Sequence, residues 1–260
     1  MRRFLITLGF MTRIPVSQTL EYREGDLEKG IVWFPIIGLL LGAIAAILYG
    51  FFSVFLPKEL AVILAILTNL CLTGAFHLDG LCDTVDGIYS ARTKERMLEI
   101  MKDSHIGTNG VVALVLDLAW KYIGIYYSRV PMLTILLLPV AGKMIQGILG
   151  YKAKYPRKEG LGLFVGTVTR GRIWICYGIG VMFLSVGMSV MQGVQARTTA
   201  HLLYGGVLGI GISLVLLLFA IWFRKYIEKK IDGITGDVMG AGSELSEMVF
   251  LLLLNINGIL

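Results

Sequence analysis

The sequence predicts an all-α integral membrane protein, a polytopic bundle of about seven transmembrane helices. Three observations lead to this fold class. Hydrophobic residues make up 56% of the 260 residues, charged residues make up only 16%, and the mean hydropathy is +0.75. Long apolar stretches recur along the chain, and its basic residues gather in alternate connecting segments. A soluble domain of this length would need a more charged surface, so we expect residues 1–260 to form one membrane-embedded domain.

Seven apolar stretches are the expected membrane spans, since a helix of about 20 residues crosses a hydrocarbon core of about 30 Å. They cover residues 31–56, 60–78, 107–127, 130–151, 173–191, 202–223 and 248–260. Residues 1–15 are charged at both ends and lack a small-residue cleavage site, so we expect an interfacial amphipathic helix and no cleaved signal peptide. Four glycines in the sixth span permit close packing against a neighbouring helix: Gly205, Gly206, Gly209 and Gly211.

The last stretch, residues 248–260, is too short to cross the membrane alone. Its 13 residues would form about 20 Å of helix. To cross, the helix would have to begin earlier and take in Glu247, Glu244 and Asp237. A carboxylate at the centre of a membrane helix costs about 2.5–3.5 kcal/mol on insertion scales, and such residues face a polar cavity or a partner. The glycine-rich segment 231–247 is therefore a second acidic motif beside the site of the first.

The distribution of Lys and Arg predicts the orientation of the chain. Nineteen of the 24 basic residues lie before the first span or after the second, fourth and sixth, and only Lys58, Arg129 and Arg197 lie in the other connections. Short cytoplasmic loops are rich in Lys and Arg, so we expect a cytoplasmic N-terminus and an outer C-terminus in the cytoplasmic (inner) membrane. The net charge of +6 then follows mostly from topology, and the basic cytoplasmic loops can also attract anionic substrates. We expect no nucleic-acid partner. The three cysteines have no paired spacing and indicate neither zinc nor a disulfide.

Asp79, Asp83 and Asp86 form the first acidic motif, directly after the second apolar stretch. On a helix, spacings of i, i+4 and i+7 place the three carboxylates within roughly 60° of one face. Their charges repel one another unless a cation lies between them, which argues against a purely structural role at a membrane edge. Carboxylate oxygens suit Mg²⁺, which commonly bridges to substrate phosphates. The motif therefore predicts a site for phosphate chemistry.

The segment that follows the motif allows two interpretations. Arg92, Arg96, Glu99 and Asp103 can line one side of a short helix. Arginines here can clamp a diphosphate, or the helix can be a solvated surface stabilised by pairs of Arg96 with Glu99 or Asp103. In the third span, Asp117 and Lys121 at i and i+4 most simply form an intramembrane ion pair.

Taken together, these motifs resemble the adenosylcobinamide-GDP ribazoletransferase, or cobalamin synthase, family. The signature is the run HLDGLCDTVDG at residues 77–87, followed by Arg92, by ER and EIMKDS at residues 95–104, and by IGT at residues 106–108. Further segments at residues 10–15, 33–38, 143, 155–164 and 233–244 agree in order, so the resemblance covers nearly the whole chain. The departures are His105, Asn109 and Cys82, where the family more often has Arg, an aromatic residue and Ala.

The resemblance implies a Mg²⁺-dependent phosphotransferase of late cobalamin biosynthesis. In its reaction, α-ribazole or its 5′-phosphate attacks the cobinamide-side phosphorus of adenosylcobinamide-GDP, releasing GMP and forming adenosylcobalamin or its 5′-phosphate. On this basis we assign metal binding to Asp79, Asp83 and Asp86, with Asp86 or Asp103 as the catalytic base. The expected substrate-binding residues are Arg92, Arg96, Lys102, Lys143, Asp237 and Glu244, and the last two would complete the metal site or orient the ribazole.

Three other functions use similar residues. A CDP-alcohol phosphotransferase of phospholipid synthesis has the same type of active site at the cytoplasmic membrane edge, but Ser90-Ala91-Arg92 matches only part of its pattern. A polyprenyl transferase uses two acidic motifs, but here Asp237 and Glu244 are seven residues apart, which is the wrong form. A divalent-cation transporter would line a path with carboxylates, yet only Asp117 lies mid-span. We expect the chain to contact membrane lipid. The sequence leaves open whether further copies of the chain or other enzymes of the pathway bind to it.

Overall fold

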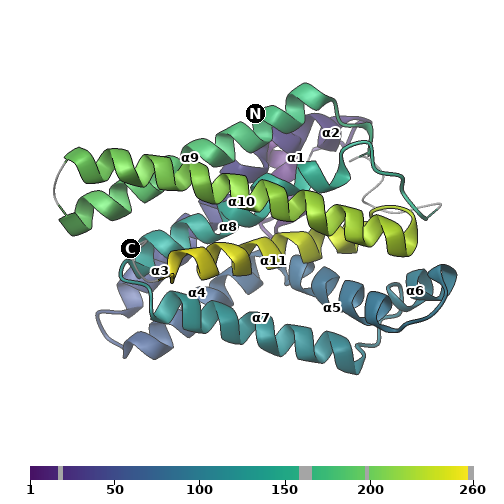
Figure 1. The fold of residues 1–260 in the computed structure, drawn as a ribbon, viewed down its shortest axis with the longest axis horizontal. Coiled ribbons are helices and arrows are strands. Elements are labelled where there is room, and N and C mark those ends of the chain that lie inside the picture. Colours follow the sequence, from purple (N-terminus) through teal and green to yellow (C-terminus); the bar gives the residue numbers. More distant parts are fainter. Residues whose placement is uncertain (17–19, 158–165, 197–198, 257–260) are drawn as a thin grey trace.

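A computed structural model describes residues 1–16, 20–157, 166–196 and 199–256. These residues form helices and contain no strand, which confirms the all-α prediction, and Figure 1 shows long helices lying side by side along the molecule. The helices are α1 (Arg2–Met11), α2 (Asp26–Gly30), the 3₁₀ helix η1 (Ile31–Trp33), α3 (Phe34–Phe52), α4 (Lys58–Thr73), α5 (Phe76–Tyr89), α6 (Lys94–Ile100), α7 (Thr108–Tyr126), α8 (Pro131–Gly150), α9 (Arg170–Ala196), α10 (Thr199–Ile231) and α11 (Gly236–Leu254).

Five helical stretches of the described chain are long and apolar enough to cross a membrane, in place of the seven expected. They are Asp26–Phe52, α7, α8, Arg170–Val194 in α9 and Ala200–Ile231 in α10. A sixth is added if α4 and α5 count as one bent span. The difference from the expectation lies in this bent pair and in α11, which carries three acidic residues and is not among these stretches.

The second apolar stretch, residues 60–78, is not the continuous helix that we expected. Helix α4 ends at Thr73, and α5 begins at Phe76 with its axis turned by 87°. Gly74 and Ala75 both have positive φ angles, of 63° and 57°, and the N–H of Gly74 caps the carbonyl of Leu70. A left-handed glycine is a common helix terminator because it has no side chain to clash. The first acidic motif therefore lies on a helix of its own.

The early start expected for the C-terminal helix is confirmed, although α11 is not among the candidate membrane spans of the described chain. Helix α11 begins at Gly236 and contains Asp237, Glu244 and Glu247. The side-chain oxygen of Thr235 accepts the N–H of Val238 and caps its first turn. With 19 residues the helix is about 28 Å long, which is close to the thickness of the hydrocarbon core. Residues 257–260 of the expected span lie outside the described residues.

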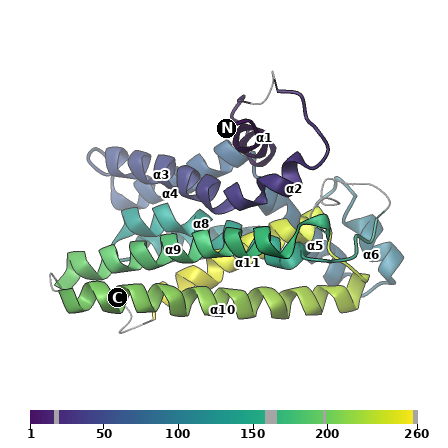
Figure 2. The same cartoon turned by 90° about the horizontal axis from the view of Figure 1, so that it is seen from above.

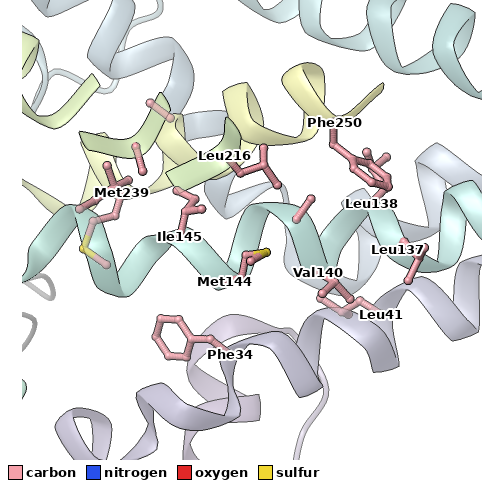
Figure 3. Packing of buried hydrophobic residues seen from close by; sticks show 14 of the residues in the cluster. Phe34, Leu41, Leu137, Leu138, Val140, Met144, Ile145, Leu216, Met239 and Phe250 are labelled. Carbon is pink, nitrogen blue, oxygen red and sulfur yellow. The ribbon is translucent and has the colours of Figure 1, made fainter. Parts of the chain in front are cut away.

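Helix α8 is the centre of the bundle, and every residue from Leu137 to Gly150 is buried. Figure 3 shows side chains of α8 between Phe34 and Leu41 of α3 on one side and Phe250 of α11 on the other. Helices α9 and α10 lie side by side along the edge of the bundle (Figure 1). The predicted close packing is confirmed at Gly205 and Gly209, where an added Cβ would lie 2.3 Å and 2.4 Å from the backbone of α9. At Gly211 an added Cβ would meet no neighbouring atom within 4 Å.

The segments that the charge pattern assigned to the cytoplasm meet at one end of the bundle. Arg2 pairs with Asp26, and Arg172 of α9 pairs with Glu28 of α2, each at 2.6 Å. Lys94 of α6 pairs with Asp232, which follows α10. The helix expected within residues 1–15 is present as α1, and Figure 2 shows it beside α2 at the periphery of the molecule.

Candidate active site

Two of the three motif aspartates line a cavity at this end of the bundle. Asp79 and Asp83 lie one turn apart on α5, and the cavity measures about 450 Å³. Lys102 and Asp103, from the turn after α6, line the same cavity. The remaining lining residues are mainly small or apolar: Ala75, Leu78, Cys82, Met101, Ser104, Ile106 and Leu114. The cavity therefore presents carboxylates and one ammonium group against an apolar wall.

The third motif aspartate, Asp86, faces a different partner. Its two carboxylate oxygens accept the backbone N–H groups of Gly107 and Gly110, at 2.7 Å and 2.8 Å, where α7 begins. A carboxylate at a helix N-terminus satisfies otherwise unpaired N–H groups and favours the helix dipole. Asp86 is not among the residues that line the cavity. The structure thus shows it joining α5 to α7, and its predicted roles as metal ligand and base remain predictions.

The second acidic motif lies against the first, as its position in the sequence predicted. Gly80 of α5 lies so close to the first turn of α11 that an added Cβ would be 2.7 Å from the carbonyl oxygen of Asp237. The Asp237 carboxylate pairs with Arg157 at 2.8 Å. Asp79 and Asp237 act as like charges on Asp83, with Arg157 opposing them. The side chains of residues more than 150 positions apart therefore share one electrostatic environment.

Arg157 is a site residue that we did not predict from the sequence. It comes from the connection after α8 and reaches Asp237 with an 11% exposed side chain. The sequence signal for it is its place in the segment 155–164, which belongs to the family resemblance. Residues 158–164 of that segment, with Lys158 and the pattern at 160–164, lie outside the described residues.

The site offers the oxygen donors that Mg²⁺ prefers, but its carboxylates are not close enough together to hold the ion. No three His, Cys, Asp or Glu side chains within the described ranges lie close enough together to hold a metal ion. Asp79, Asp83 and Asp237 nevertheless offer only oxygen donors, and their mutual repulsion would fall if a divalent cation lay between them. Asp79 is exposed, on the side of α5 that lines the cavity.

The four predicted phosphate contacts have different surroundings. Lys102 lines the cavity. Arg96 pairs with Glu99 at 2.8 Å with both side chains 63% exposed, which is the solvated surface pair left open by the sequence. Arg92 is exposed on the connection before α6. Lys143 is buried on α8, where its Nζ donates to Ser243 at 3.0 Å, and it does not line the cavity.

Asp103 is held by His105, one of the departures from the family pattern. The backbone N–H of His105 donates to the Asp103 carboxylate at 3.1 Å, and its Nδ1 lies 2.7 Å from the same oxygen. These hydrogen bonds from His105 lower the pKa of Asp103 below its ordinary value. A carboxylate with a lowered pKa is a weaker base but a good acceptor for a substrate hydroxyl.

A second polar cluster lies deeper in the bundle, and Glu244 belongs to it. The Nζ of Lys121 on α7 contacts Asp117 and Glu247, each at 3.1 Å, and also Glu244. All four side chains are at most 9% exposed. The predicted ion pair of Asp117 with Lys121 is confirmed, but the sequence did not indicate that Lys121 also binds the two glutamates of α11.

This cluster surrounds a separate cavity of about 40 Å³, lined by Lys121, Lys143, Glu244 and Glu247 with His77. The structure therefore does not bring Lys143 and Glu244 to the cavity of Asp79 and Asp83. It joins them to each other at a deeper level, where charged groups are stable only when they are paired.

Fold and site together define a class: a polytopic helical membrane protein in which carboxylates of α5 and the turn after α6, with Lys102, line a cavity at one end of the bundle, beside the pair of Asp237 with Arg157. Within that class, the chain belongs to the cobalamin-5-phosphate synthase family, whose family model matches residues 3–255.

Relatives in several bacteria agree with this family over nearly their full lengths. The chain is 37% identical over 258 residues to a protein of Clostridium novyi (strain NT) named adenosylcobinamide-GDP ribazoletransferase, covering 98% of this chain and 96% of that protein. It is 39% identical over 261 residues to a protein of the same name from Citrobacter koseri, covering 96% and 98%. No solved structure matches the chain. The resemblance drawn from the motifs is thereby confirmed.

Proposed function

We propose that the chain joins adenosylcobinamide-GDP with α-ribazole, or with its 5′-phosphate, and releases GMP. The observation that carries this proposal is the family match from residue 3 to residue 255, which includes both acidic motifs. The packing of α5 against α11 supports it, because the two motifs meet beside a cavity large enough for part of a nucleotide-activated substrate.

The residues of the site divide into three groups in this proposal. Asp79, Asp83 and Asp237 would hold Mg²⁺, which when bound neutralises charge on the diphosphate. Lys102 on the cavity wall, with Arg92 nearby in sequence, would contact the phosphates. Of the two candidate bases, Asp103 lines the cavity, where it can accept a hydrogen bond from the attacking hydroxyl.

Orientation in the membrane is part of the same proposal. The cavity lies at the end of the bundle that carries most of the basic segments, and the positive-inside rule places that end in the cytoplasm of the cell. Both substrates are made there, so a cavity that opens to this side receives them directly. The surrounding cations, including Lys102, would attract anionic substrates.

The experiment is an assay of GMP release and cobamide formation by the detergent-purified protein, with adenosylcobinamide-GDP, α-ribazole and Mg²⁺. Asp83→Asn and EDTA should each lower turnover by at least about 10²-fold, since both remove charge stabilisation from the transition state. Glu24→Gln is the matched control, because Glu24 is an exposed acid on the connection before α2, and it should retain full turnover.

Asp86→Asn separates a positioning role from a metal-binding role. The substitution replaces one acceptor oxygen with an NH₂ group, which would face an N–H donor at the start of α7. We therefore expect the unfolding temperature to fall even when substrate and metal are absent. Absence of GMP release with either ribazole form, in folded protein with Mg²⁺, would contradict the proposed function.

A further inference from the structure

A second cavity of about 450 Å³ lies at the same end of the bundle and shares no residue with the cavity of Asp79 and Asp83. It is bounded by the C-terminal end of α8, the first turns of α9 and the C-terminal half of α10. Residues of α9 and α10 line it, and these two helices lie along the edge of the bundle (Figure 1). Nothing in the proposed reaction uses it.

The walls of this second cavity are apolar, whereas its rim is basic. The apolar lining comes from three helices: Ile148 of α8, Ile173 and Trp174 of α9, and Leu217 and Ile221 of α10. The rim carries Arg170, Arg224 and Lys225, with Glu228 as its acid. A ligand for such a cavity needs an anionic group and an apolar body.

The cations of the rim are not equally available. Arg224 is occupied, because its guanidinium pairs with Glu228 at 2.9 Å and donates to the carbonyl oxygen of Tyr151. Arg170 and Lys225 are exposed and make no ion pair or hydrogen bond with any described residue. Two exposed positive charges therefore line the cavity without a partner among the described residues.

The lengths of α9 and α10 place these charges at the level of lipid head groups. Residues 173–194 of α9 and 200–223 of α10 contain no Asp, Glu, Lys or Arg, and span about 33 Å and 36 Å of helix. This matches a hydrocarbon core of about 30 Å, so Arg170 and Lys225 lie just outside it. Trp174 and Trp222, exposed by 46% and 61%, occupy the adjoining level, where tryptophan is enriched in membrane proteins.

We propose that this cavity binds an anionic phospholipid of the surrounding bilayer. Its phosphate would lie between Arg170 and Lys225, and an acyl chain would run along the apolar wall formed by Ile173, Leu217 and Ile221. Basic pockets between membrane helices at the cytoplasmic interface have the chemistry that recognises such head groups. A free phosphate would use the two cations but would leave the apolar wall without a partner, so the lipid is the better fit.

The bound lipid would link three helices near the first site. Tyr151, whose carbonyl oxygen is held by Arg224, begins the connection that carries Arg157 to Asp237. A lipid that contacts α8, α9 and α10 together would hold both ends of this connection. Its removal should therefore lower the unfolding temperature of the protein.

The test is native mass spectrometry of the detergent-purified protein, titrated separately with phosphatidylglycerol and phosphatidylcholine. The unmodified protein should bind the anionic lipid about tenfold more tightly. Arg170→Gln with Lys225→Gln should reduce this ratio to near one. Lys229→Gln with Lys230→Gln is the matched control, since it removes two charges from the same end of α10 outside the cavity, and it should preserve the ratio.

Two further experiments decide whether the cavity binds a lipid or a free anion. Leu217→Trp keeps both cations but fills the apolar wall, so it should weaken phosphatidylglycerol binding several-fold while the folded state is verified by its unfolding temperature. Inorganic phosphate at equal concentration should not displace the lipid. An undiminished preference for phosphatidylglycerol over phosphatidylcholine in the Arg170→Gln and Lys225→Gln double variant, or displacement of the lipid by phosphate, would overturn the proposal. Neither outcome depends on GMP release, so the proposed function stands or falls separately.

Discussion

Lys121 is the residue on which the deeper polar cluster depends. Three carboxylates from α7 and α11 contact its ammonium group, and Lys143 is the other cation close to them. With every group ionised the cluster carries one formal negative charge in excess. A buried charge without its counter-ion is far more costly than an intact pair, so the cluster should respond strongly to loss of Lys121.

We expect Lys121→Met to lower the free energy of unfolding by about 3–5 kcal/mol, because it leaves Asp117, Glu244 and Glu247 without their shared cation. The measurement is reversible unfolding in mixed micelles. Adding Glu244→Gln should restore part of the loss, since it removes one of the uncompensated charges. Lys229→Met, on the exposed end of α10, serves as the control and should change stability by less than about 0.5 kcal/mol. Equal effects of Lys121→Met and Lys229→Met would show that the cluster is not an energetic unit.

At the scale of single residues, the sequence indicated pairs that are close along the chain. Asp117 and Lys121 are one helical turn apart, and their contact follows from helix geometry alone. The contacts of Lys121 with Glu244 and Glu247, and of Arg157 with Asp237, join residues 80 or more positions apart. No local pattern encodes such partners.

At the scale of elements, the junction of α5 and α11 decides whether the two acidic motifs meet. Gly80 lies against the backbone of Asp237, and Gly240 lies against the backbone of His77. The absence of side chains at both positions lets the helices approach closely. The sequence shows that the second motif is rich in glycine, but it does not show which helix lies against those glycines.

We expect Gly80→Ala to separate α5 from α11 and to lower both stability and turnover. The added Cβ would lie 2.7 Å from the Asp237 carbonyl oxygen and 3.0 Å from its Cα, and neither backbone atom can move without shifting the helix. Overpacking of this kind costs about 1–3 kcal/mol. Unfolding temperature and GMP release should be measured together.

Gly211→Ala is the matched control for Gly80→Ala. Gly211 lies within α10 and has no neighbour within 4 Å, so the same substitution should leave turnover unchanged and raise stability by up to about 1 kcal/mol. If Gly80→Ala behaved like Gly211→Ala, the close approach of α5 to α11 would not be needed for the site.

At the scale of the whole molecule, the ends of the bundle differ in charge and in chemistry. One end joins the basic segments through ion pairs such as Arg2 with Asp26 and Lys94 with Asp232. The connections at the other end, including the one before α4, carry few charges. This asymmetry predicts the direction of insertion into the membrane.

The orientation can be tested with single cysteines in a protein whose Cys71, the exposed native thiol, is replaced by alanine. Ser53→Cys lies in the connection between α3 and α4, and Glu95→Cys lies on α6 at the opposite end; both positions are exposed. A membrane-impermeant maleimide should label Ser53→Cys in right-side-out vesicles and Glu95→Cys only in inside-out vesicles. The reverse pattern would place the proposed active site outside the cell.

The sequence by itself determined the properties that depend on composition and on neighbours along the chain. These are the helical membrane class, the segregation of basic residues, the early start of α11, and the pair of Asp117 with Lys121. Hydropathy and helical spacing are local, so they can be read without knowing which helices touch.

Only the tertiary structure decided how the helices share their charged groups. The break at Gly74 and Ala75 lies inside an apolar run, where hydropathy contains no signal for a turn. Asp86 binds the start of α7, whereas Glu244 joins a deeper cluster, although both belong to acidic motifs in the sequence. These assignments depend on packing between distant segments, because a buried charge is stabilised by whichever partner the fold places within reach.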